Sequence, residues 1–392
     1  MSLLPVAEAQ ARLLALAALL PPKTVPIDRA VGRWLAQDLL ALRDQPWSDL
    51  SAMDGYALRA AEFPGPWQVI GESAAGTAQQ PLLAAGQACR IFTGAPLPPG
   101  ADAILIQENA IRDGDRLTAN ADPLLAGRHV RSRASDFADG ATLMPAGVRL
   151  GPAQIALAVL AGHGTLTVRR RPCVALLSTG NELVPAGMST PPGFLPSSNA
   201  PMLAAMLGAL PCDVLDLGIV PDDLDAMVTA FDRARDADII VSTGGASVGD
   251  HDLVRPAFAR AGGTLDFWKI RMRPGKPLMA GRVGNAVFLG LPGNPVSAFV
   301  TAFLFLLPLV RHMSGASNPL PASMEATLAG PLPATGERDD YLRAFRGADG
   351  VVSVTSQDSA ATAAMAIADC LILRPAGSPA IEAGMRATIL PF

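Results

Sequence analysis

The chain has 392 residues; half of them are apolar and 17% are charged, a composition that is typical of a globular protein and excludes a disordered one. Its length favours roughly two to four domains. The net charge of −4, without a dense run of Lys or Arg, argues against a general nucleic-acid binder and against a protein of anionic membrane surfaces. The four cysteines lie far apart without zinc-ligand spacing, which predicts reduced thiols in a cytoplasmic protein.

The N-terminal part opens with an apolar stretch at residues 13–20, which follows Glu8 and Arg12 and stops at two prolines. This pattern predicts a short amphipathic helix and argues against a signal peptide. Up to about residue 172 the chain is rich in Gly and Pro, and much of it is predicted to be β structure. Its strand-like runs are residues 67–70, 88–92 and 103–107. Two motifs in this region, SAMDGYA at 51–57 and FTGAPLPPGAD at 92–102, are locally typical of turns only.

From residue 173 to about 314 the pattern alternates between strands and helices. Strands are predicted at 174–178, 213–220, 238–242 and 286–289, and helices at 199–210 and 222–235. Such alternation indicates a parallel sheet, whose ligands bind beyond the carboxyl ends of the strands. The apolar segment at 296–310 has about 15 apolar or small residues, short of the roughly 20 that span a bilayer, so it is predicted to be a buried helix.

Two similar segments end strands of this predicted sheet: VALLSTGNEL at 174–183 and DIIVSTGGASVGDHD at 238–252. A buried strand that opens into a Gly-rich turn presents backbone N–H groups to an anion, and nearby carboxylates can hold a metal ion. In the second loop, the residues that suit a phosphate and Mg²⁺ are Gly244, Gly245, Ser247, Asp250 and Asp252. The alternative is an ordinary capped strand-to-helix turn, and neither a P-loop nor a dinucleotide-binding glycine motif is present.

Three further acidic residues follow strands on the same predicted rim. Glu182 comes directly after the first turn and can share a site with the second loop if the two strands are neighbours. Asp222 and Asp223 follow the strand that ends at residue 220. The alternatives are a solvated surface carboxylate for Glu182 and helix capping for the aspartate pair.

Basic residues gather in the segment WKIRMRPGKP. Alternation predicts Lys269, Arg271 and Arg273 on one face of an extended strand, and the Pro-Gly turn holds Lys276 close by. Such a pocket suits a tetrahedral oxyanion; the alternative is a solvated edge strand. The LPGNP segment at 291–295 predicts a turn in which Asn294 caps the apolar helix. Residues 315–323 read as a linker to a small β-barrel or sandwich.

Six motifs, SAMDGYA, FTGAPLPPGAD, LLSTGNEL, STGGASVGDHD, RPGKP and LPGNPVSA, resemble in this order those of the molybdopterin molybdenumtransferases, the family of bacterial MoeA and the E domain of gephyrin. The resemblance implies a multidomain α/β plus β fold. Residues 1–45 and 141–172 would form a linking domain whose N-terminal helix packs on the α/β domain, and residues 46–140 would form an inserted β-rich domain. Residues 173–314 would form a three-layer α/β domain with a parallel-rich sheet, similar to molybdopterin adenylyltransferase. Residues 318–392 would form a small β-barrel.

The activity that the resemblance implies is insertion of molybdate into adenylylated molybdopterin, with metal-dependent pyrophosphate cleavage and release of AMP. It also implies a cytoplasmic homodimer with Mg²⁺ as cofactor, contact with the molybdopterin adenylyltransferase, and no nucleic-acid or membrane partner. The active cleft would combine the α/β domain of one subunit with the inserted domain of the other. Two alternatives are adenylyltransferase activity and a non-enzymatic scaffold role as in gephyrin.

The site residues implied by the resemblance fall into three groups. The catalytic group is Asp54, Glu182, Asp222 and Asp252, of which the last three hold the metal. The substrate-binding group is Thr93, Arg131, Asp136, Gly244, Gly245, Ser247, Lys269, Pro292 and Pro295. The molybdate-binding group is Arg273, Lys276, Arg343 and Ser359. Arg273 stands where many members have Lys, which leaves the preference between molybdate and tungstate open, and Ser197 replaces an acidic residue near the cleft.

Overall fold

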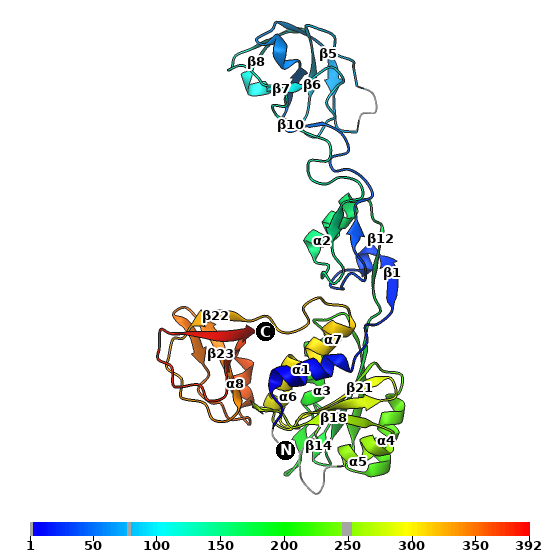
Figure 1. Ribbon diagram of the computed structural model, residues 1–392, viewed down its shortest axis with the longest axis vertical. Helices are drawn as coiled ribbons and strands as arrows, with labels where there is room; N and C mark the ends of the chain where they lie inside the picture. The colour runs from blue at the N-terminus through cyan, green and yellow to red at the C-terminus, as the bar shows by residue number, and fades with distance from the viewer. Residues whose placement is uncertain (1–2, 77–79, 245–252) are drawn as a thin grey trace.

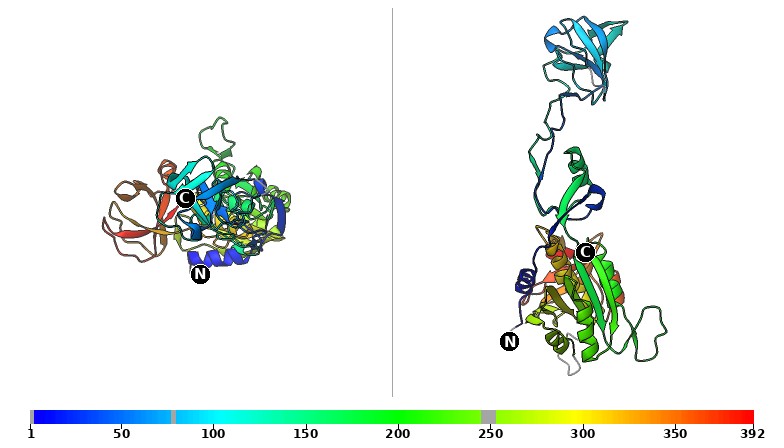
Figure 2. Two further views of the ribbon diagram at one scale, coloured as in Figure 1. Left: turned by 90° about the horizontal axis from the view of Figure 1, so that it is seen from above. Right: turned by 90° about the vertical axis from the view of Figure 1, so that its right-hand side faces the viewer.

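The structure is a computed structural model that describes residues 3–76, 80–244 and 253–392. The molecule is elongated, as Figure 1 and the right-hand view in Figure 2 show. The inserted domain lies at one end, the α/β domain and the barrel lie side by side at the other, and the linking domain lies between them. The predicted multidomain architecture of α/β and β parts is therefore confirmed.

The α/β domain is built on a six-stranded sheet in the order β16-β13-β17-β21-β20-β18. Its strands are β13 (Cys173–Thr179), β16 (Asp213–Val220), β17 (Ile239–Thr243), β18 (Thr264–Trp268), β20 (Met279–Val283) and β21 (Ala286–Leu291). The first four strands in the sheet order are parallel, whereas β20 and β18 join antiparallel. The sheet is thus mixed, with the parallel-rich half that the alternating pattern predicts.

Helices cover both faces of this sheet, which makes the domain three-layered. Alternate residues of the central strands enter two separate cores: Leu176 and Val241 pack into one, Leu177 and Ile240 into the other. The helices on the first face are α1 (Val6–Ala15), α3 (Asn199–Leu207), α6 (Pro295–Thr301), the π-helical turn η4 (Ala302–Leu306) and α7 (Leu307–Met313), and those on the second face are α4 (Leu224–Arg233) and α5 (Val254–Arg260).

The N-terminal helix α1 packs on the α/β domain through Val6, Ala9 and Leu13, all buried in the first core. It begins and ends earlier than the predicted 13–20, because the apolar residues that reach the core are spaced three and four apart from residue 6 onward. The apolar stretch toward residue 20 instead leads into the linking domain.

The apolar helix runs from the LPGNP turn to Met313, beyond the apolar stretch at 296–310 at both ends. Elements α6, η4 and α7 run continuously over Pro295–Met313, 19 residues with a mean hydropathy of 1.7, so this helix is long and apolar enough to cross a membrane by length and composition. However, 83% of its apolar window is buried inside the protein, as expected for the core helix that the sequence predicts. The π-helical turn precedes Pro308, which has no backbone N–H to donate.

The linking domain is formed by two separate passes of the chain. Strand β1 (Pro22–Pro26) pairs antiparallel with β12 (Thr165–Arg169), and β2 (Leu39–Leu40) pairs with β11 (Thr142–Met144). Helix α2 (Pro152–Leu160) packs Ala158 into their small core, and the short turn η1 (Ile27–Arg29) follows β1.

The inserted domain is a six-stranded sheet in the order β7-β4-β6-β5-β9-β8. Its strands are β4 (Gly55–Leu58), β5 (Trp67–Ser73), β6 (Gln87–Ile91), β7 (Ala103–Ile106), β8 (Ala110–Asp113) and β9 (Arg116–Ala119); the short elements are β3 (Leu50–Ser51), β10 (Val130–Arg131), η2 (Ala60–Glu62) and η3 (Gln107–Asn109). The three strand-like runs predicted in this region are confirmed as β5, β6 and β7.

The C-terminal module is a small barrel of β22 (Met324–Thr327), β23 (Asp339–Gly347), β24 (Gly350–Ser353), β25 (Cys370–Arg374) and β26 (Arg386–Pro391), with helix α8 (Thr362–Ala366). Antiparallel pairing runs β24-β23-β25-β26-β22, and a bridge between Leu328 and Val351 brings the end of β22 back to β24. The ladder is thereby closed, which confirms the predicted barrel.

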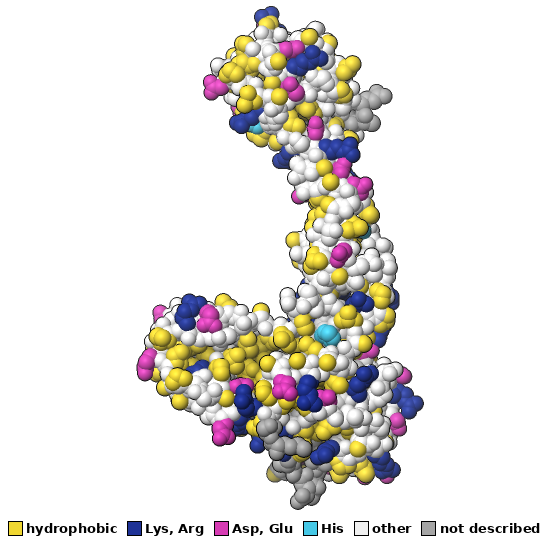
Figure 3. All heavy atoms as spheres, viewed as in Figure 1, with side chains coloured by type: hydrophobic (Ala, Val, Ile, Leu, Met, Phe, Trp, Pro, Cys, Tyr) yellow, Lys and Arg dark blue, Asp and Glu magenta, His cyan; other side chains and the backbone are white. Residues whose placement is uncertain are grey.

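The barrel is attached to the α/β domain in two ways. The two-residue strand β19 (Met272–Arg273) of the α/β domain pairs parallel with β23. In addition, the ring of the C-terminal residue Phe392 lies 4.9 Å from that of Phe299 and 5.6 Å from that of Phe303, centroid to centroid. Figure 3 shows hydrophobic side chains gathered in the hollow between these two domains, while acidic and basic side chains are interspersed over the α/β domain.

Candidate functional site

Three strand ends meet at the carboxyl rim of the parallel half-sheet. Ser178 pairs with Thr243 across β13 and β17, and Thr243 pairs with Leu291 across β17 and β21. The two Ser-Thr-Gly turns and the LPGNP turn are therefore immediate neighbours. The condition that the two turns lie on adjacent strands, on which the shared-site prediction depends, is met.

Close backbone packing explains the glycines at this rim. A Cβ atom on Gly244, which has a φ of +96°, would lie 2.5 Å from the carbonyl oxygen of Thr179, and one on Gly293 would lie 3.3 Å from the Cα of Gly244. The Thr179 hydroxyl donates to the Thr243 carbonyl at 3.3 Å. Side chains larger than a hydrogen atom would push the turns apart, so the glycines let the three turns pack side by side.

The acidic residues Glu182 and Asp222 lie on this rim and are both exposed. The Asn181 amide N–H donates to Asp222 Oδ2 at 3.2 Å, and the Asp222 N–H donates to Asn181 Oδ1 at 3.1 Å. This reciprocal pair joins the turn after β13 to the turn after β16. The Glu182 carboxylate folds back over Gly180, where a Cβ atom would lie 2.5 Å from Glu182 Oε2.

The neighbouring residue Asp223 caps a helix, as the alternative interpretation of the aspartate pair predicts for it. The Asp223 carboxylate accepts from the Ala226 amide at 2.8 Å and caps the N-terminus of α4. Asn294 likewise caps α6 as predicted, accepting from the amides of Val296 and Ser297, and its turn is held by a bond from Asn199 Nδ2 to the Gly293 carbonyl at 2.7 Å. Pro292 and Pro295 lie on either side of this capped turn.

Part of the second loop lies outside the described residues: Gly245, Ser247, Asp250 and Asp252. Their implied roles stay predictions. Within the described ranges, no group of three or more His, Cys, Asp or Glu side chains is placed to hold a metal ion. Glu182 and Asp222 are exposed carboxylates of the type that Mg²⁺ takes as ligands, since this ion is usually bound by one or two carboxylates together with substrate phosphates.

The basic segment does not form one extended strand. Strand β18 ends at Trp268, and Lys269 adopts a left-handed φ of +69°, so the prediction that Lys269 shares a strand face with Arg271 and Arg273 is wrong. Its physical reason is tertiary: Ile270 is fully buried and the Leu4 backbone pairs with it, which turns the chain here. The Lys269 ammonium instead lies 4.2 Å from the centroid of the Trp268 ring.

The four residues implied to bind molybdate do not all converge. Arg273 lies opposite Asp340 of β23, and Asp340 lies opposite Arg374 of β25, so these three side chains form a row on one face of the barrel sheet. Arg343 is three positions further along β23 and points to the other face. Lys276 is exposed in the loop after Arg273.

The Arg343 guanidinium is almost fully buried, at 1% exposure, and is already engaged. It donates to the carbonyl oxygens of Ser356 at 3.1 Å, Asp358 at 3.0 Å and Ala361 at 3.3 Å. These bonds hold the loop that carries Ser359. In this arrangement Arg343 supports the loop, and its burial lowers its pKa by desolvation.

In the inserted domain, Asp54 and Thr93 are in contact. Asp54 Oδ1 accepts from the Thr93 amide at 2.7 Å and from the Thr93 hydroxyl at 2.8 Å. These two bonds, with a smaller contribution from the charge of Arg90, hold the pKa of the Asp54 carboxyl below its usual range, so it is ionised at neutral pH. Arg131 and Asp136 are both exposed, and neither is among the ion pairs that the structure's described residues form.

The two groups of site residues lie at opposite ends of one chain. Asp54 and Thr93 belong to the inserted domain and Glu182 and Asp222 to the α/β domain, with the linking domain between them (Figure 1). Asn181 and Arg90 were missed by sequence reasoning. Asn181 stands inside the LLSTGNEL motif and could have been found there, whereas Arg90 has no motif signal of its own.

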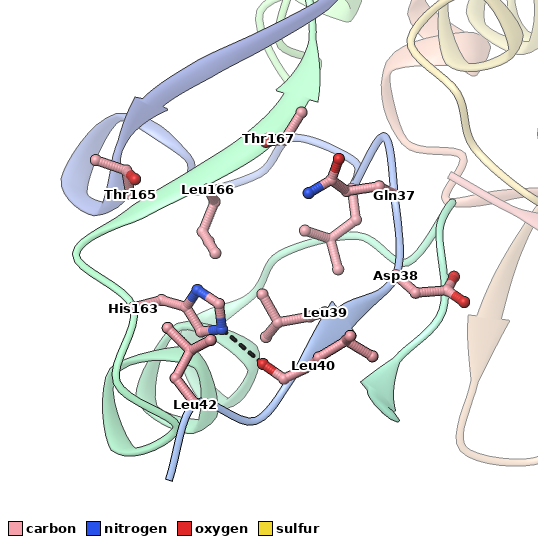
Figure 4. A pocket seen from close by; sticks show the side chains of 10 residues that line it. Gln37, Asp38, Leu39, Leu40, Leu42, His163, Thr165, Leu166 and Thr167 are labelled. Carbon is pink, nitrogen blue, oxygen red and sulfur yellow. Dashed lines mark hydrogen bonds between the residues drawn. The ribbon is translucent and has the colours of Figure 1, made fainter. Parts of the chain in front are cut away.

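Two of the cavities in the described part of the chain lie in the α/β domain and in the linking domain. One, of about 370 Å³, lies beside the rim, between the edge of β16 and the start of α3; Ser178, Ser197 and Asp216 supply its polar lining. The other, of about 330 Å³, lies in the linking domain between β2 and β12 (Figure 4). There the His163 ring bonds through Nε2 to the Leu40 carbonyl oxygen at 2.8 Å. Only the first cavity adjoins the site residues.

Three protein-family profiles match the chain. They are the MoeA N-terminal region (domain I and II) at residues 4–162, the probable molybdopterin binding domain at 175–312 and the MoeA C-terminal region (domain IV) at 325–392. Among curated relatives, the molybdopterin molybdenumtransferase of Haemophilus influenzae is 32% identical over 375 residues, 93% of each chain. That of Nostoc is 36% identical over 325 residues, 80% of this chain and 74% of the relative.

Solved structures agree with these matches. Two structures of the molybdopterin biosynthesis MoeA protein of Pyrococcus horikoshii superpose with TM-scores of 0.84 and 0.88, at 28% and 25% identity. Both comparisons cover all of this chain, and 99% and 100% of the other.

Proposed function

The chain belongs to the MoeA family of molybdopterin molybdenumtransferases, and from this premise we propose which of its residues carry out the transfer. It is a transferase of molybdenum cofactor biosynthesis. We propose that its substrates are adenylylated molybdopterin and molybdate, and that cleavage of the pyrophosphate bond releases AMP while molybdenum passes to the dithiolene sulfurs.

The observation that carries this proposal is the convergence of three glycine turns with two carboxylates on one rim. Gly180, Gly244 and Gly293 stand at neighbouring strand ends, and the lack of a side chain on Gly244 and Gly293 lets the turns pack against one another at the rim to which the phosphates are proposed to bind. The Asn181 bonds orient Asp222 toward the same rim. A pyrophosphate with its counter-ion needs both features, because its charge is stabilised by backbone dipoles and by a cation at once.

Glu182 and Asp222, with Asp252, would hold Mg²⁺ in this proposal. When bound, the ion neutralises charge on the pyrophosphate and polarises the bond that breaks. The residues of the chain contribute the rest: the turns bind the phosphates, and Arg273 with Lys276 receives the tetrahedral oxyanion. Arg374 lies in the same row as Arg273 but is buried and donates to the Pro379 carbonyl, so the exposed Arg273 is the guanidinium that is open to an oxyanion there.

Asp54 and Thr93 would complete the cleft from a second copy of the chain. Two observations support this proposal. Asp54 and Thr93 lie far from the rim within one chain, as Figure 1 shows for their domains. In addition, Asp54 is ionised, and both of its bonds to Thr93 are made by Oδ1. A homodimer that brings the inserted domain of one subunit to the α/β domain of the other would unite the two groups.

The test is turnover with adenylylated molybdopterin, molybdate and Mg²⁺, followed as AMP release. Asp252→Asn should abolish AMP release while adenylylated molybdopterin still binds. Asp223→Asn is the matched control, because Asp223 caps α4 and points its carboxylate at the helix. Normal AMP release by Asp252→Asn would refute the assignment, and product formation from ATP and molybdopterin would favour the adenylyltransferase alternative.

A further inference from the structure

Arg90 occupies a central position in the inserted domain, next to the Asp54 and Thr93 pair. It lies on β6 directly opposite Tyr56 of β4. Its guanidinium carbon is 5.2 Å from the centroid of the Tyr56 ring and 4.8 Å from that of the Phe92 ring. Both rings therefore hold the guanidinium plane, and Phe92 directly precedes Thr93.

The same guanidinium holds the backbone that carries Asp54. Its Nη1 donates to the Gly55 carbonyl at 3.0 Å, and its Nη2 donates to Gln107 Oε1 at 2.8 Å. The backbone N–H of Gln107 in turn donates to the Asp54 carbonyl oxygen at 3.1 Å. Arg90 thus holds one of the two carbonyls at the Asp54–Gly55 turn directly and the other through Gln107.

The turn has no room to shift. A Cβ atom on Gly55 would lie 2.1 Å from the Leu105 carbonyl oxygen, so the backbone is pressed against β7 on the side away from Arg90. The orientation of the Asp54 carboxylate then depends on the two Thr93 bonds and on the position of Phe92, against which Arg90 packs. The other charged group beside Arg90 is Glu72, which lies opposite it on β5.

We propose that Arg90 is a positioning residue for the transfer reaction: it holds Asp54 and Thr93 in the one arrangement in which they act, without contacting substrate itself. This inference rests on the proposed function of Asp54. A purely structural role, in which Arg90 stabilises the inserted domain and nothing more, is the competing account. Arg59 offers the comparison, because it donates to two carbonyls of the same domain, those of Gly100 and Leu83, each at 3.0 Å.

The experiment compares Arg90→Gln, Arg90→Lys and the control Arg59→Gln in the full chain. For Arg90→Gln we expect AMP release to fall about tenfold to a hundredfold, and the pKa of Asp54, followed by carboxyl NMR, to rise toward its ordinary value. Arg90→Lys retains the charge but loses the paired hydrogen bonds from Nη1 and Nη2. It should therefore keep a lowered Asp54 pKa and lose nearly as much turnover as Arg90→Gln. Arg59→Gln should lower the melting temperature while leaving both turnover and the Asp54 pKa unchanged.

Two outcomes would overturn the inference. Wild-type turnover in a folded Arg90→Gln or Arg90→Lys variant would show that the arrangement does not need Arg90. Equal losses in Arg59→Gln would show a general stability effect. The variant Asp54→Asn distinguishes failure of the inference from failure of the proposed function. Full activity of Asp54→Asn would refute the role of Asp54 and, with it, the role of Arg90. Inactive Asp54→Asn together with active Arg90 variants would refute the role of Arg90 alone.

Discussion

The contact between Asp54 and Thr93 makes the stability of the inserted domain depend on pH. Because the folded-state pKa of Asp54 is lowered, the Thr93 bonds contribute stability above the ordinary Asp value of about 3.9, and this contribution is lost as the pH falls through the folded-state pKa. Thr93→Val removes the hydroxyl bond and keeps the amide bond. We expect the Asp54 pKa to rise partway and turnover to fall about tenfold.

The measurement is an NMR titration of Asp54 together with melting curves at pH 7 and at a pH below the folded-state pKa that the titration finds. The difference in melting temperature between wild type and Thr93→Val should shrink as the pH falls through that pKa, because the Thr93 bonds lose their charged partner. Thr93→Ser, which keeps the hydroxyl, is the control and should titrate like the wild type. A melting difference that is the same at both pH values would contradict the assignment.

Asp54, Thr93 and Arg90 are residues whose roles the local sequence does not predict. Asp54 sits in an Asp-Gly turn and Thr93 in a Gly-Pro loop, and the local pattern of either predicts only a turn; the family resemblance is what singles them out. Their contact depends on pairing between β4 and β6, which joins residues about 35 positions apart. Arg90 has no signal in the sequence for the same reason, since its partners come from two other segments: Gly55 and Tyr56 from β4, and Gln107 from η3.

At the scale of elements, the rim of the α/β sheet makes a sharp prediction about Gly244. Gly244→Ala adds a Cβ atom 2.5 Å from the Thr179 carbonyl oxygen at a φ of +96°. Gly262→Ala is a matched control, with a similar φ of +82° and nothing within 4 Å of the added atom. The control should cost about 1 kcal/mol of stability with normal turnover, whereas Gly244→Ala should cost more and reduce AMP release at least about tenfold. Equal turnover in the two variants, measured on folded protein, would show that the packing of the turns is not needed.

The loop of residues 356–361 in the barrel gives a second prediction at this scale. Arg343→Met removes the donors of three carbonyl oxygens in a buried place, which should cost about 2–4 kcal/mol of unfolding free energy. Arg346→Met, on the same strand, loses only an exposed pair with Asp369 and should cost less than about 1 kcal/mol. Denaturant unfolding measures both. Hydrogen exchange should show faster exchange in the loop for Arg343→Met; an unchanged loop with weaker molybdate binding would instead favour direct contact with the oxyanion.

Strands and helices were predicted correctly where they depend on the local hydrophobic pattern. Predictions were wrong or missing where an element depends on contacts between distant segments. Strands β13, β16, β17 and β21 carry buried apolar runs or follow a helix at the expected spacing, so their positions and type follow from the sequence, whereas their order in the sheet comes from the structure. The turn at Lys269 does not follow from the sequence, because the alternation of basic residues there predicts a straight strand. The chain bends because Ile270 pairs with Leu4, which is 266 positions away. The antiparallel edge of β20 and β18 is likewise a tertiary feature without a signal in the helix-strand alternation.

At the scale of the whole molecule, the separation of the two half-sites makes cooperation between subunits testable. If Asp54 of one subunit acts with Asp222 of the other, a homodimer holds two shared sites. In a heterodimer of Asp54→Asn with Asp222→Asn, one site then carries both substitutions and the other carries neither. The two homodimers should be inactive, and the purified heterodimer should recover about half of the wild-type AMP release.

The same heterodimer distinguishes this arrangement from one in which the elongated chain folds its own ends together. If each chain supplied both Asp54 and Asp222 to its own site, every site in the heterodimer would carry one substitution, and no activity would return on mixing. A heterodimer that pairs the wild-type chain with a chain carrying both substitutions reverses the expectation. It should be inactive if the sites are shared, since each site then receives one altered residue, and half active if they are not. The order of activities in these two heterodimers therefore shows whether the inserted domain acts within its own chain or across the dimer, independently of how strongly either single substitution impairs catalysis.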